Sequence, residues 1–65
     1  MLYDVVGVNL KTKLVRFMAQ GEDETNAEAV VKIAVIRRGV EEEFFVEVPE
    51  GSYEEGEKWE GQREV

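Results

Sequence analysis

The chain has 65 residues, no cysteine, no histidine and a formal net charge of −7 at neutral pH. A chain of this length forms one domain at most and buries only about 60% of the surface of its unfolded state. The lack of cysteine excludes disulfide bonds and thiolate metal sites, and it fits a cytoplasmic location, which we expect. The longest aliphatic run, residues 33–36, is far shorter than the roughly 20 residues that span a bilayer, so we expect no membrane or export segment.

The negative charge is concentrated in the last part of the chain. Residues 41–65 contain ten glutamates but only Lys58 and Arg63 as cations, whereas residues 1–40 are close to neutral. A summed field of this sign opposes general attraction to nucleic-acid phosphates and to anionic membranes.

Two strands are predicted at the beginning of the chain. Residues 2–10 and 14–20 are rich in β-branched residues and alternate between two faces. The polar turn between them is short, and a connection of this length joins antiparallel neighbours. The sequence therefore predicts a β-hairpin.

A helix of about three turns is predicted for residues 25–38. Thr25 and Glu28 have the spacing of a capping box, in which the hydroxyl and the carboxylate satisfy free backbone N–H groups. Two arginines fall in the last turn, where cations suit the helix dipole, and Gly39 suits the left-handed residue that ends many helices. The β-branched residues inside this segment favour a strand instead, but the two caps outweigh them.

A third strand is predicted for residues 41–48, which alternate between an apolar face and a face that combines glutamates with Phe45. The expected fold class is α+β: a small two-layer domain over residues 1–50, in the order β-β-α-β(-β). One helix covers one face of a mainly antiparallel sheet of three or four strands.

Residues 51–65 are predicted to form an acidic C-terminal segment rich in glycine and glutamate. Disordered segments normally lack aromatic residues, so we expect Tyr53 and Trp59 to dock on the domain, in a loop or a short fourth strand. The end of the segment is expected to fray.

The helix carries more apolar residues than one face requires. Placed at steps of about 100°, Ala27, Val30, Val31 and Ala34 form one stripe, and a second stripe lies elsewhere on the helix. We also expect an apolar outer face on the sheet. Large exposed apolar patches usually mark interaction surfaces. The sequence therefore predicts a homo-oligomer, most simply a two-fold dimer. Its interface residues would be Ile33, Ile36, Phe45, Tyr3 and Val5.

An alternative is that the C-terminal segment folds back over Phe45. In that case Ile33 and Ile36 would be ordinary scattered surface residues.

We expect no enzymatic activity. The chain has no histidine or cysteine and only one serine, so the usual general base and nucleophiles are missing. The glutamates do not have the spacing of a calcium loop, and residues 22–24 place acid where a phosphate would bind at a helix N-terminus. We therefore also expect no cofactor and no metal site.

The expected function is that of a small, non-enzymatic interaction protein that self-associates, and a second protein is a further candidate partner. Two alternatives remain open. The acidic C-terminal segment could occupy a basic groove of another protein, as an inhibitor that imitates DNA. A nucleic-acid-associated regulator could instead use a basic hairpin, although the net charge makes nucleic acid an unfavoured partner. The candidate contacts for nucleic acid are Lys11, Lys13, Arg16, Arg37 and Arg38.

Overall fold

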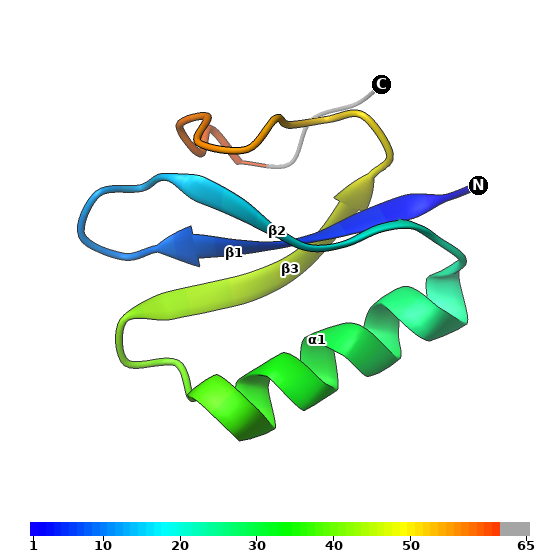
Figure 1. Ribbon diagram of the computed structural model, residues 1–65, viewed down its shortest axis with the longest axis horizontal. Helices are drawn as coiled ribbons and strands as arrows, with labels where there is room; N and C mark the ends of the chain where they lie inside the picture. The colour runs from blue at the N-terminus through cyan, green and yellow to red at the C-terminus, as the bar shows by residue number, and fades with distance from the viewer. Residues whose placement is uncertain (62–65) are drawn as a thin grey trace.

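The computed structural model of the protein describes residues 1–61. Within these residues, three strands form one antiparallel sheet in the order β2-β1-β3, and one helix crosses it (Figure 1). This confirms the predicted α+β class with the element order β-β-α-β. The elements are β1 (Tyr3–Asn9), β2 (Val15–Glu22), α1 (Glu24–Arg38) and β3 (Glu43–Pro49).

The helix begins one residue earlier than predicted and has a different N-cap. The N-cap is Asp23, whose Oδ1 accepts a hydrogen bond from a backbone N–H of the first turn at 2.8 Å. The capping box predicted at Thr25 and Glu28 is therefore wrong. Aspartate caps helices as well as threonine does, and its charge also suits the positive end of the helix dipole. At the other end, Gly39 has a φ of 70° and donates its N–H to the carbonyl of Val35, as a helix-ending glycine does.

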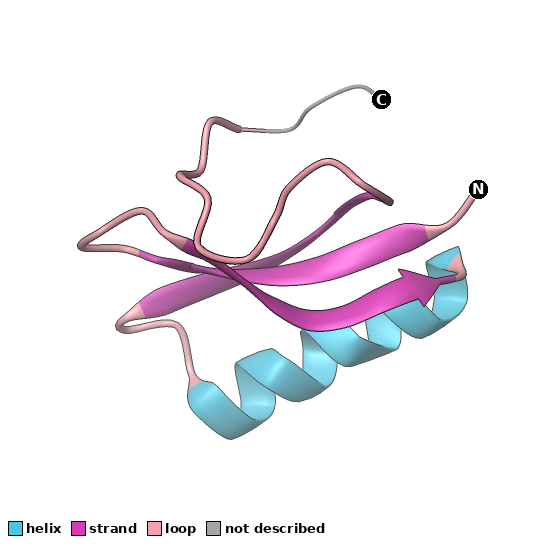
Figure 2. Cartoon of the chain, turned by 45° about the horizontal axis from the view of Figure 1, so that its top comes forward, coloured by secondary structure: helices cyan, strands magenta, loops and turns pink. Residues whose placement is uncertain are grey.

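Both faces of the sheet are covered. The helix lies on the face of Val5 and Phe45 and approaches it closely through the small residues Ala27 and Ala34, which are buried. On the opposite face runs the C-terminal segment, of which residues 51–61 are described (Figure 2). Tyr53 of that segment completes the buried cluster on this face, whose other members are Val6, Val8, Val15 and Val48.

The expected outward position of Val5 and Phe45 is wrong. Their exposed fractions are 0% and 8%, because α1 packs on their face of the sheet. The other face, with Phe44, is covered by Trp59, whose ring meets that of Phe44 edge-on at a centroid distance of 5.5 Å. The alternating pattern of a strand assigns its residues to two faces of the sheet. It does not show which face packs against the helix when a later segment of the chain covers the opposite face.

The C-terminal segment also covers part of the outer edge of β2. The N–H of Val15 donates to the carbonyl of Glu57, and the N–H of Gly56 donates to the carbonyl of Val15, both at 2.8 Å. Instead of a regular fourth strand, the described residues here contain one isolated bridge, between Leu14 and Lys58. The expected fraying of the chain end falls on residues 62–65, outside the described residues.

Candidate functional site

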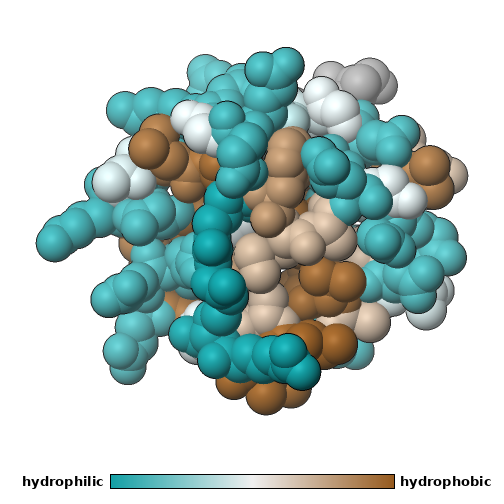
Figure 3. Space-filling model, viewed as in Figure 1, coloured by the Kyte–Doolittle hydropathy of each residue, from teal (hydrophilic) through white to brown (hydrophobic). Residues whose placement is uncertain are grey.

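Apolar side chains remain exposed on the side of α1 that points away from the sheet. Ile36 is 82% exposed and Ile33 is 51% exposed. Together with Ala29 and Lys32 they form what we call the outer face of α1. Figure 3 shows hydrophobic side chains gathered at the lower edge of the molecule, where α1 lies in Figure 1. The surplus of apolar residues expected from the sequence is therefore present on the helix.

Of the five residues predicted at an interface, only Ile33 and Ile36 are well exposed. Val5 and Phe45 are buried under α1, and Tyr3, at the start of β1, is half-buried. An interface on the outer face of the sheet is therefore inconsistent with the burial of these residues. The helical part of the prediction stays open to test.

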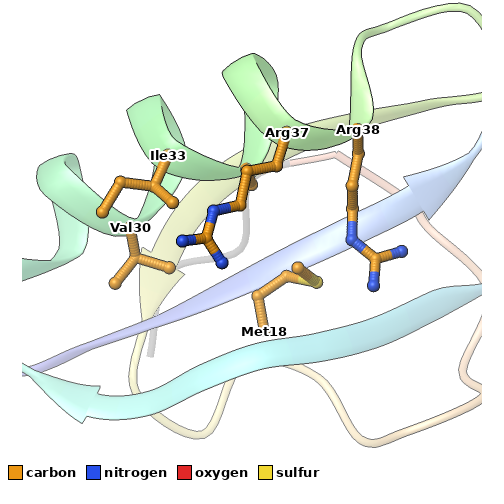
Figure 4. A pocket seen from close by; sticks show the side chains of 6 residues that line it. Met18, Val30, Ile33, Arg37 and Arg38 are labelled. Atoms are coloured by element: carbon orange, nitrogen blue, oxygen red, sulfur yellow. The ribbon is translucent and has the colours of Figure 1, made fainter.

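A groove of about 440 Å³ borders the outer face of α1 on the side of β2. Its lining is mainly apolar, with arginines at one end. Figure 4 shows two guanidinium groups extending from α1 toward β2, on either side of Met18. The lining residues are Met18, Val30, Ile33, Ala34, Arg37 and Arg38.

The two arginines of this groove differ in their ionic contacts. Nη1 of Arg38 lies 3.5 Å from Oε1 of Glu43. Arg37 has no ion-pair partner in the part of the chain that the structure describes. The last turn of α1 therefore presents a positive charge that is not neutralised within residues 1–61.

The first half of α1 has the opposite charge. Asp23 and Glu24 stand at its beginning and Glu28 follows one turn later. Glu47 of β3 lies nearby, and its pKa is raised, first by burial and then by the negative charges of Glu28 and Glu24. Negative charge thus accumulates at the beginning of the helix, and positive charge at its end.

The basic residues proposed for nucleic-acid binding do not all face solvent freely. Arg16 holds Glu43 with two hydrogen bonds, from Nη2 to Oε1 at 2.9 Å and from Nε to Oε2 at 3.2 Å. Because Arg38 also contacts Glu43, this one carboxylate engages two of the five cations. Lys11 and Lys13 are exposed in the connection between β1 and β2, and Lys13 accepts a backbone hydrogen bond from the acidic C-terminal segment.

Some glutamates of the C-terminal segment are used to hold the segment in place. Glu55 accepts a hydrogen bond from the backbone N–H of Phe17 at 2.6 Å. Glu57 accepts one from the backbone N–H of Glu54 at 2.9 Å. These two carboxylates therefore have structural contacts in addition to their charge.

Asp4 is a buried charged residue that sequence reasoning missed. Its Oδ1 accepts a hydrogen bond from the N–H of Gly21, and its Oδ2 accepts one from the N–H of Gly51, both at 3.1 Å. This carboxylate joins β1 to the β2–α1 connection and to the start of the C-terminal segment. The available signal was a charged residue inside an otherwise apolar strand pattern. Its contacts indicate a structural role.

Within residues 1–61, no group of three acidic side chains is arranged to hold a metal ion. No helix in the same range combines the length and the apolar character needed to cross a membrane. Comparisons of the chain with protein-family models, with curated proteins and with solved structures gave no match.

Proposed function

We propose that the protein is a small, non-enzymatic interaction protein of the cytoplasm that self-associates as a dimer through the outer face of α1. The observation that carries this proposal is the exposure of Ile36 and Ile33 side by side on one helix. Full burial of an isoleucine side chain is worth about 1.5–3 kcal/mol. For a domain of this size, with a total stability of a few kcal/mol, such burial is a large contribution.

The faces of the sheet offer no comparable surface. One is covered by α1 and the other by Tyr53 and Trp59. An interface made by the helix is therefore favoured over one made by a sheet face.

The edges of the sheet are also unfavourable for pairing with a second copy. Part of the β2 edge is bonded to the C-terminal segment. The strand at the other edge, β3, carries Glu47 and ends at Pro49, which has no backbone donor. Charged residues and proline on an edge strand disfavour pairing with another sheet edge. The outer face of α1 is therefore the favoured interface.

The test is the sedimentation behaviour of the purified protein at micromolar concentrations. We expect a dimer for the wild type and a monomer for the variant that combines Ile33→Glu and Ile36→Glu. A matched control is Leu14→Glu, because Leu14 is exposed to nearly the same extent as Ile33, 46% against 51%, but lies in the connection between β1 and β2. The control should still dimerise. A wild type that stays monomeric at every concentration, or a double variant that still dimerises, would overturn the proposal.

Nucleic-acid binding is the weaker alternative. Arg16 and Arg38 are already engaged by Glu43, and the net charge is −7. Both features reduce the electrostatic attraction to phosphate that such binding needs. A gel-shift assay at low salt is the direct test, and we expect no retardation of duplex DNA at tens of micromolar protein.

A further inference from the structure

We propose that the two helices of the dimer pair antiparallel, so that the basic end of one α1 lies over the acidic beginning of the other. This inference rests on the proposed function, because it specifies how a second copy occupies the outer face of α1. The observation behind it is the distribution of charge along that helix, together with the position of its exposed isoleucines in the second half of the helix.

The charges of α1 separate into two halves. The acidic residues are the N-cap Asp23, Glu24 in the first turn, and Glu28 one turn further along. The basic side chains follow in the second half, at Lys32 and in the last turn. A parallel pair would place like charges side by side at both ends. An antiparallel pair brings opposite charges together at both ends and also aligns the helix dipoles favourably.

The exposed apolar residues fit the same arrangement. Ile33 lies just past the middle of α1 and Ile36 one turn nearer its end, with the small residue Ala29 on the same face. In an antiparallel pair centred on the middle of α1, at Val31, Ile33 of one copy lies opposite Ala29 of the other, and Ile36 lies opposite the first turn of the other. Large side chains then face small ones, which permits close packing.

Ionic contacts within the monomer leave both ends available. Arg37 has no ion-pair partner among residues 1–61, although its neighbour Arg38 contacts Glu43. At the other end, neither Glu24 nor Glu28 has an ion-pair partner among residues 1–61. A guanidinium group from a second copy would therefore meet negative charge that the described part of the monomer leaves unpaired.

The experiment uses three proteins: wild type, Arg37→Glu, and the charge-swapped variant Glu24→Lys/Arg37→Glu. In the antiparallel dimer, Arg37→Glu places an acidic residue at the end of each helix against the acidic beginning of the other. This repulsion occurs at both ends of the helix pair, so we expect self-association to weaken by about tenfold. The charge-swapped variant restores opposite charges at both ends. Its self-association should return to nearly the wild-type level in sedimentation measurements.

Mixing distinguishes the two orientations. With antiparallel helices, a mixed dimer of wild type and the charge-swapped variant has like charges at both ends, so native mass spectrometry of isotope-labelled mixtures should show mainly unmixed dimers. With parallel helices, the mixed dimer is the complementary one and should dominate. Mixed dimers in excess, or no recovery in the charge-swapped variant, would overturn the antiparallel arrangement.

The two proposals fail in different ways. If the wild type is a monomer, self-association itself is wrong. If the wild type is a dimer that Ile33→Glu and Ile36→Glu disrupt, but the charge variants associate and mix without preference, only the orientation is wrong. Circular dichroism of each variant shows that the fold is retained before association is compared.

Discussion

Arg16 and Glu43 form an ion pair that passes over the central strand, with Nη2 of Arg16 2.9 Å from Oε1 of Glu43. The residue of β1 between them is Gly7, which pairs with Arg16 on one side and with Phe45 on the other. A Cβ atom at position 7 would lie 3.0 Å from Oε2 of Glu43 and 3.1 Å from the ring of Phe45. The missing side chain lets the ion pair and the ring lie against the strand, beneath α1.

Gly7→Ala should therefore destabilise the protein by about 1–3 kcal/mol, the usual cost of overpacking. Urea unfolding followed by circular dichroism measures the change. The same substitution in a Glu43→Ala background should cost less, because one of the two close neighbours is gone. An equal cost in both backgrounds would assign the whole effect to the ring of Phe45.

Asp4→Ala should cost at least about 2 kcal/mol, because two backbone donors lose a charged acceptor and a hydrogen bond to a charged group contributes about 1.5–3 kcal/mol. Asp4→Asn is the matched control, since its amide retains one acceptor oxygen and should keep part of the stability. Amide hydrogen exchange at Gly21 and Gly51 provides a local measurement. If exchange there does not accelerate in the alanine variant, the carboxylate does not hold these two segments.

The contacts of Asp4 illustrate what the sequence did not reveal. Its two donors lie 17 and 47 residues further along the chain, so no local pattern indicates them. The β-β-α-β order, by contrast, follows from short-range signals: alternating strands, a short turn, and a glycine at the end of the helix. The exposed pair Ile33 and Ile36 was also predictable, because helical spacing alone separates it from the buried alanines. Which sheet face the helix covers depended on the C-terminal segment, and that contact is long-range.

The N-cap of α1 provides a direct comparison between the predicted cap and the observed one. Asp23→Ala removes the side-chain acceptor of the first turn and should cost about 1 kcal/mol. Thr25→Ala should be close to neutral, because Asp23 occupies the cap position. Thermal or urea unfolding of both variants measures the difference. A larger loss of stability in Thr25→Ala than in Asp23→Ala would instead support the predicted capping box.

Trp59→Ala should destabilise the domain by about 2–3 kcal/mol. Trp59 is only half-buried, so we expect less than the 3–5 kcal/mol typical of a fully buried aromatic residue. The loss includes its stacking on Tyr53, at a centroid distance of 5.2 Å, and its edge contact with Phe44. Trp59→Phe, which keeps a ring, should lose less. Urea unfolding followed by far-ultraviolet circular dichroism suits both variants, and a neutral alanine substitution would show that the ring contacts of Trp59 add no stability.

Glu47 gives a prediction about pH. Burial, then Glu28 and Glu24, raise its folded-state pKa above the ordinary value of 4.5, so the folded state binds this proton more tightly than the unfolded state does. The ionised group therefore destabilises the fold at neutral pH, and this penalty disappears as the pH falls through the raised pKa toward 4.5. Glu47→Gln, which is always neutral, should be more stable than the wild type at pH 7.

The advantage of Glu47→Gln should shrink as the pH is lowered, because the wild-type carboxyl group becomes protonated. Comparing the two proteins at each pH cancels the titration of the other carboxylates, which both proteins share. Free energies of unfolding from urea titrations between pH 7 and pH 4.5 measure the difference. A constant difference across this range would mean that Glu47 does not carry a raised pKa in the folded protein.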